Sequence, residues 1–114
     1  MSARDDEVRN PVAELQRRAR ALARLLDEHG LLRAWPTLFS HKLIALEHLA
    51  AHFEHEERLT EAQLNARLNE LHAFGDAAVL RRWMVEYGLF RRTRDGSAYW
   101  LESTEVPEGA VEPR

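Results

Sequence analysis

The pair Asp95-Gly96 constrains the fold of this chain more than any other feature of its sequence. An Asp-Gly pair between two short runs of apolar and aromatic residues is the strongest local signal for a tight β-hairpin, because glycine adopts the positive φ angles that such turns need. The segments 89–93 and 98–101 are therefore predicted to be the two strands. Most of the chain before them shows the apolar spacing of helices, so the hairpin is expected to close a mostly helical domain.

Each predicted helix follows a residue whose side chain can cap free backbone N–H groups. The helices and their caps are 11–29 after Asn10, 41–54 after Ser40, 61–73 after Thr60 and 77–87 after Asp76. Thr60 forms a capping box with Gln63, and Pro11 suits the first helical position. Gly30 is predicted to end the first helix and Gly88 the last. The short segment 58–60 is expected to pair as a single strand.

This order of elements predicts a mostly α fold with a small β-hairpin, namely a winged helix-turn-helix preceded by an extra N-terminal helix. The final segment is rich in Glu and Pro, a composition typical of disorder. The predicted division is a disordered N-terminus at 1–10, the N-terminal helix at 11–30, the winged-helix domain at 31–101 and a disordered acidic tail at 102–114.

Composition limits the classes of function. The chain has 114 residues, the size of one domain, and no Cys, which rules out disulfides and thiolate chemistry. No apolar run is long enough for a membrane span, and the first residues do not resemble a secretory signal, so we expect a cytoplasmic protein. A phosphate-binding glycine loop, Gly-x-Ser-x-Gly and His-Glu-x-x-His are all absent from the sequence, so we expect no enzyme.

Basic charge is concentrated in residues 76–100. Arginines of the fourth helix and the wing are predicted to contact double-stranded DNA through bases and phosphates, and these are Arg81, Arg82, Arg91, Arg92 and Arg94. The same arginines could instead form ion pairs within the domain. The net charge of −3 and the pI near 6.1 favour an alternative function, a protein–protein interaction module on the same scaffold without DNA binding.

Histidine is the second unusual feature. The spacing of His41, His48, His52 and His55 would place all four on one stripe of a helix over 41–54 and just beyond it. Two imidazoles at i and i+4 can bind one Zn²⁺ or Ni²⁺, so a weak metal site at His48, His52 and His55 is possible, with His72 or a second subunit completing it. The alternatives are a polar helix face and a pH-sensitive interface, and no other cofactor is expected.

The N-terminal helix carries an apolar stripe formed by Leu15, Leu22, Leu25 and Leu26. This stripe could pack on the domain itself or on a second copy of the chain. In the second case the protein would be a homodimer that presents two DNA half-sites about one helical turn apart. The sequence leaves both arrangements open.

Several short motifs follow one another along the segment that ends at Trp100. They are Leu-Leu-Arg-Ala-Trp-Pro at 31–36, Leu-Glu-His-Leu-Ala at 46–50 before Phe53, Leu-Thr-Glu at 59–61, the 65–68 stretch, Leu-Arg-Arg at 80–82, Tyr-Gly-Leu at 87–89, an Arg at 91 or 92, Asp-Gly at 95–96 and Tyr-Trp at 99–100. With these motifs the chain resembles the prokaryotic domain-of-unknown-function family numbered two thousand and eighty-seven. The resemblance implies a winged-helix-like domain that occurs alone or joined to transcription-regulator domains.

Overall fold

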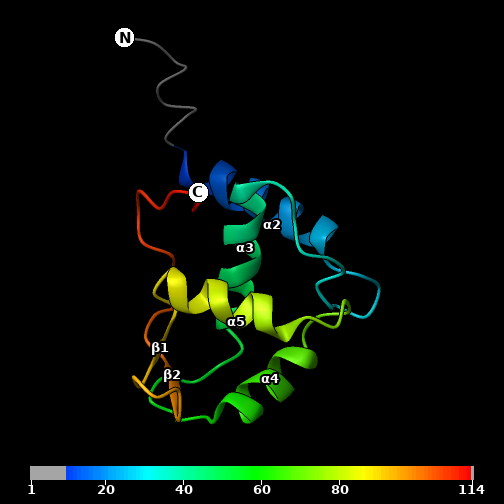
Figure 1. Cartoon of the computed structure of the whole chain (residues 1–114). Helices are drawn as coiled ribbons and strands as arrows, with labels where there is room; N and C mark the ends of the chain where they lie inside the picture. The colour runs from blue at the N-terminus through cyan, green and yellow to red at the C-terminus, as the bar shows by residue number, and fades with distance from the viewer. Residues whose placement is uncertain (1–9, 114) are drawn as a thin grey trace.

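The computed structural model describes residues 10–113 of the chain (Figure 1). Its elements are α2 (Pro11–Leu25), α3 (Phe39–Ala50), α4 (Glu61–Asn69), α5 (Ala77–Glu86), β1 (Phe90–Arg92) and β2 (Tyr99–Leu101). This helical content with one small antiparallel hairpin confirms the secondary-structure part of the predicted fold class. Of the segment predicted to be disordered, residues 1–9 lie outside the described part of the chain. None of the described helices has the length and apolar composition needed to cross a bilayer.

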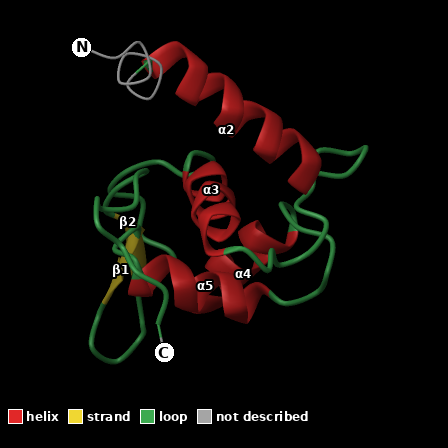
Figure 2. Cartoon of the chain, turned by 90° about the horizontal axis from the view of Figure 1, so that it is seen from above, coloured by secondary structure: helices red, strands yellow, loops and turns green. Residues whose placement is uncertain are grey.

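Helix α3 lies at the centre of the molecule, between α2 on one side and α5 on the other (Figure 2). Helix α4 packs against α5 at the end of the molecule away from α2. The buried core consists of the inward side chains of α3, α4 and α5. Its largest fully buried helical side chains are Leu46 and Leu49 of α3, Leu64 and Leu68 of α4, and Leu80 and Met84 of α5. The α5 residues are those that the three- and four-residue spacing predicts.

The hairpin closes one end of this core. Phe90 pairs with Leu101, Arg91 with Trp100 and Arg92 with Tyr99. Side chains alternate between the two faces of a strand, so Phe90 and Leu101 point into the core while Arg91 and Trp100 take the outer face. Leu59 joins the edge through two backbone hydrogen bonds with Tyr99, with N···O distances of 2.8 and 2.7 Å. The predicted pairing of segment 58–60 is therefore confirmed at Leu59.

Three of the four predicted helix caps are confirmed. Asn10 accepts the backbone N–H of Val12 and Ala13, Thr60 and Gln63 form both halves of a capping box, and Asp76 accepts the N–H of Val79.

The prediction that Ser40 caps the second helix is wrong, because α3 begins at Phe39, two residues before the predicted start at 41, and its N-cap Leu38 makes no side-chain cap. The Phe39 ring packs against Trp83 of α5 and against Tyr87, the C-cap of that helix, with ring centroids 6.2 and 5.8 Å away. The first residue of α3 is thus packed on α5 by aromatic contacts instead of being preceded by a polar cap.

Helix α2 ends at Leu25, four residues before the predicted end at 29. Leu26 leaves the helix to form an antiparallel bridge with Leu32, and the Asp27 carboxylate accepts the N–H of His29 and Leu31. These hydrogen bonds lower the pKa of Asp27, with the bond from Leu31 as the largest cause. Gly30 lies in this turn, at a φ of +80°, rather than at the helix end.

Helices α3 and α4 also stop short of the predicted ends at 54 and 73. After Ala50 the chain turns, so that Phe53 enters the core edge-on to Phe90, at a centroid distance of 5.0 Å. After Asn69 the chain makes a turn at 70–71, and His72 then forms a parallel bridge with Leu32. Both α3 and α4 therefore end earlier than their apolar spacing predicts, at points where the chain turns to contact segments distant in sequence.

Residues 102–113 pack against the domain, which corrects the prediction of a disordered tail. The tail runs back beside the domain toward the start of α3 (Figure 1). Val106 and Ala110 contact the core, and the N–H of Val106 donates to the Glu47 carboxylate over 2.7 Å. Further along, Tyr87 donates its hydroxyl hydrogen to the Val111 carbonyl, and Lys42 pairs with Glu112 at 2.8 Å. Apolar contacts, two hydrogen bonds and an ion pair thus hold the acidic segment on the domain.

Candidate nucleic-acid interface

A hollow of about 230 Å³ lies between the outer face of α5 and the hairpin. Its lining residues are Ala78, Arg81, Arg82, Val85, Glu86, Arg92 and Tyr99. The hollow thus brings together three of the five arginines predicted to contact DNA. Two come from α5, and Arg92 comes from the strand that faces it.

Arg81 forms a hydrogen bond and an ion pair within the domain. Its guanidinium donates a hydrogen bond to the Asn65 side chain of α4 and lies 3.9 Å from the Glu61 carboxylate. The side chain is only 20% exposed. For Arg81, therefore, the intramolecular alternative holds, and the residue joins α4 to α5 while part of its charge still faces the hollow.

Arg82 and Arg92 hold their charge toward solvent. Arg82 is exposed on α5 and takes part in none of the ion pairs found among residues 10–113. Arg92 lies over the Tyr99 ring, with 6.0 Å from its guanidinium carbon to the ring centroid, and donates to the carbonyls of Thr93 and Arg94 at 3.3 Å each. Backbone acceptors orient the Arg92 guanidinium without neutralising it.

Arg91 and Arg94 lie away from the hollow lining. Arg91 shares the outer face of the hairpin with Trp100 and lies 3.9 Å from the Glu102 carboxylate. Arg94 is exposed in the turn between the strands. The alternation of side chains along a strand separates Arg91 from Arg92, and charge alone does not contain this information.

The hairpin turn contains the predicted Asp-Gly pair, with Gly96 at a φ of +75°. The Asp95 carboxylate accepts hydrogen bonds from the Ser97 N–H at 3.0 Å and the Thr93 hydroxyl at 2.8 Å. Hydrogen bonds from Ser97 and then from Thr93 lower the pKa of Asp95 to about 2. The carboxylate therefore remains ionised and holds the turn that carries Arg92 and Arg94.

The outer face of the hairpin carries a contact that the sequence analysis missed. The Arg58 guanidinium stacks on the Trp100 ring, with its central carbon 4.2 Å from the ring centroid. On the neighbouring strand, Arg91 is the residue paired with Trp100. The predicted strand at 58–60 and the alternation of the return strand together could have placed these residues in one row.

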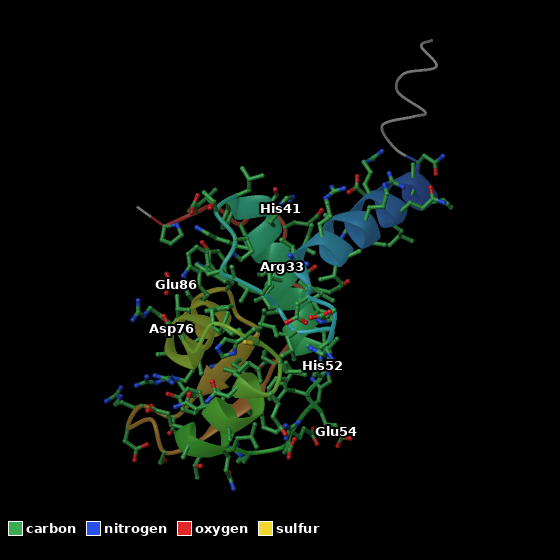
Figure 3. The ribbon with its side chains drawn as sticks, turned by 90° about the vertical axis from the view of Figure 1, so that its right-hand side faces the viewer. Arg33, His41, His52, Glu54, Asp76 and Glu86 are labelled. Atoms are coloured by element: carbon green, nitrogen blue, oxygen red, sulfur yellow. The ribbon has the colours of Figure 1, made fainter. Side chains whose placement is uncertain are left out.

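The four histidines do not share one helical stripe. His41 and His48 belong to α3, but His52 and His55 follow its last residue, and Figure 3 shows His41 and His52 at opposite ends of α3. The rings of His48 and His52 meet edge-on at 4.9 Å. Burial, and then the charge of His52, lowers the pKa of His48. Within residues 10–113 no three His, Cys, Asp or Glu side chains gather as metal ligands, so the predicted trio with His55 does not assemble in this chain.

His72 cannot complete such a site either, because both of its ring nitrogens are occupied. The ring is 4% exposed. Its Nδ1 lies 2.7 Å from the Leu68 carbonyl, and its Nε2 accepts the N–H of Asp76 over 2.9 Å. The imidazole ring thus bridges the two helices and ties the end of α4 to the start of α5.

Two comparisons with known proteins give no relative. No curated protein and no solved structure matches the chain. A family model does match residues 31–101, and its description is an uncharacterised protein conserved in bacteria, DUF2087. The match covers more than half of the chain and includes α3, α4, α5 and the hairpin, while α2 and the tail lie outside it. The chain therefore belongs to the DUF2087 family of uncharacterised bacterial proteins.

Proposed function

We propose that this chain is a non-enzymatic, winged-helix DNA-binding protein of the transcription-regulator type. Helix α5 would enter the major groove, and the hairpin would lie beside it as the wing. One observation carries the proposal: Arg82 and Arg92 reach the same open hollow from these two elements. Guanidinium groups at such a junction suit phosphates and guanine edges, which they contact through two parallel hydrogen bonds.

The order of elements supports this assignment. Helix α3, the paired residue Leu59, α4, α5 and the hairpin follow one another as in a winged helix-turn-helix. In that arrangement the second helix of the pair presents its outer face to DNA. The outer face of α5 carries the small residue Ala78 beside Arg82, so a DNA backbone could approach it closely.

The acidic groups around the hollow set an upper limit on the affinity. Glu86 lines the hollow, and Glu61 lies next to Arg81 on its α4 side. These carboxylates repel phosphates, so few cations are left to neutralise DNA. We expect a small phosphate footprint and a binding constant with a shallow salt dependence.

The experiment measures fluorescence anisotropy on a duplex that the protein itself selects from a random-sequence pool, over a salt series. Arg82→Ala should weaken binding about five- to a hundredfold and reduce the preference over random duplex, as loss of a base contact does. Arg92→Ala should weaken binding to all duplexes alike and flatten the slope of log K against log salt by about 1.

Arg91→Ala is the matched control, because it removes the same charge from the outer face of the hairpin. If all three variants bind as the unchanged chain does, or if Arg91→Ala costs as much as Arg82→Ala, the interface is misassigned. If no duplex is selected at all, the alternative of a protein-interaction module takes its place, and the pI near 6.1 favours that alternative.

The proposal includes a homodimer formed through α2. Helix α2 packs on α3 through Ala21, but Val12 and Leu15 stay 60% and 66% exposed on another side of the helix. Burying such a pair against its copy would remove apolar surface from water. Light scattering should give twice the chain mass for the unchanged protein and the chain mass for Leu15→Glu. A single-chain mass for both refutes the dimer.

A further inference from the structure

A second groove, with a volume of about 470 Å³, lies between α2 and α3, away from the hairpin. Four arginines of α2 line it, together with Ser40 and His41 at the start of α3. Its floor is apolar and consists of Ala21, which is buried, with the half-buried Leu43 and Ile44. A groove with cationic walls and an apolar floor favours a ligand that is both anionic and apolar.

Two of the four arginines are neutralised within the domain. Arg17 pairs with Glu14 at 2.9 Å, and Arg18 pairs with Glu47 of α3. Arg20 and Arg24 are exposed and take part in none of the ion pairs that residues 10–113 form. The groove therefore carries two uncompensated positive charges.

The spacing of these charges fits a protein segment. Arg20 and Arg24 lie one turn apart on one flank of α2, about 6 Å along its axis at ~1.5 Å per residue. Carboxylates at positions i and i+4 of a second helix have the same separation. Nucleic acid would supply the charge, but its phosphates have no apolar groups to cover Leu43 and Ile44.

Two other occupants fit less well. Helix α3 separates the groove from α5, so the groove and the hollow beside the hairpin lie on different sides of the domain (Figure 2). A straight duplex held at α5 would not reach α2. A second copy bound groove to groove would bring the same arginine flank against this one, and the like charges would repel. The dimer proposed above uses Val12 and Leu15, on another side of α2.

We propose that the groove between α2 and α3 binds an acidic amphipathic segment of another protein. Carboxylates of the segment would pair with Arg20 and Arg24, and its apolar side chains would cover Leu43 and Ile44. This inference stands apart from the DNA-binding proposal, because it uses another surface of the protein.

The test uses a labelled synthetic helical peptide with glutamates on one face and leucines on the adjacent face, titrated with the full chain at physiological salt. The double variant Arg20→Gln/Arg24→Gln should bind it about three- to thirtyfold more weakly, as expected for two partly exposed ion pairs. Ile44→Ser should weaken the leucine-bearing peptide but leave an all-polar acidic peptide unchanged.

The matched control is Arg58→Gln/Arg91→Gln, which removes the same charge from the outer face of the hairpin. Equal weakening by both double variants overturns the inference, because it would reflect overall charge alone. A random duplex that outcompetes the peptide at Arg20 and Arg24 also overturns it and assigns the groove to nucleic acid. Binding of the selected duplex should not change in Arg20→Gln/Arg24→Gln, so the two proposals can fail independently.

Discussion

His72 is expected to fix the relative position of α4 and α5, and replacing it tests that role. The variant His72→Phe keeps a flat ring of similar size and the contact with Phe74, whose ring centroid lies 4.5 Å from that of His72. It removes both ring nitrogens, and with them the bonds to the Leu68 carbonyl and the Asp76 N–H. The substitution thus isolates the two hydrogen bonds from the packing.

The two bonds differ in what their loss costs. The Leu68 carbonyl also accepts the Leu71 N–H over 2.9 Å, so it keeps a partner and only a net bond of about 0.5–1.5 kcal/mol is lost. The Asp76 N–H loses its acceptor, which costs about 1–3 kcal/mol for a buried group. Asp76 is an exposed residue, so water can reach part of this N–H and the lower half of that range applies. Together the two costs give an expected loss of about 1.5–3.5 kcal/mol in the free energy of unfolding.

Urea unfolding followed by circular dichroism measures this loss, and thermal unfolding should show a Tm lower by roughly 5–20 °C. The control is His29→Phe, at a side chain that is 75% exposed, which should change the stability by less than about 0.5 kcal/mol. If His72→Phe unfolds with the same midpoint as the unchanged protein, the two hydrogen bonds do not hold the helices together.

Two further predictions concern groups that hold the hairpin and the tail. The carboxyl of Asp95 should titrate near pH 2 by NMR, because hydrogen bonds from Ser97 and Thr93 favour its ionised form. The lowered pKa stabilises the folded turn above pH ~4, and this contribution is lost as the pH falls through about 2. A midpoint near 3.8 would contradict the prediction. Glu47→Ala should cost about 1–3 kcal/mol in urea unfolding and speed hydrogen exchange at the Val106 N–H, which loses its acceptor. Unchanged exchange at Val106 would show that the tail is held elsewhere.

Local chemistry predicted the starts of most elements. Asn10, Thr60 and Asp76 cap the helices that follow them, and Asp95-Gly96 forms the turn between the strands. These features depend on residues within four positions of one another, so the sequence alone contains the whole interaction. The inward faces of the helices were predictable for the same reason, because helical periodicity is local.

The ends of the helices were not predictable in this way. Helix α2 stops at Leu25 because Leu26 pairs with Leu32, and α3 stops at Ala50 because Phe53 turns to meet Phe90. In each case a partner beyond the helix competes with the next helical hydrogen bond; for α2 it lies six residues further on, and for α3 it lies in the hairpin. Helix propensity says nothing about that partner, so the apolar pattern overestimated both helices.

The residues of the candidate site were also predictable only in part from the sequence. Charge along the sequence located the five arginines, but only the packing of α4 on α5 showed that Arg81 is held by Asn65 and Glu61. The register of the hairpin separated Arg91 from Arg92. The histidine trio failed because it depended on a helix continuing past Ala50.

By itself, the sequence determined the type and order of the elements, their caps and the hairpin turn, because the forces involved act over a few residues. The tertiary structure decided where the helices stop, which arginine charges remain available, how the tail is anchored and that a basic groove forms between α2 and α3. Each of these outcomes depends on contacts between residues far apart in the chain, and those contacts exist only once the core has closed.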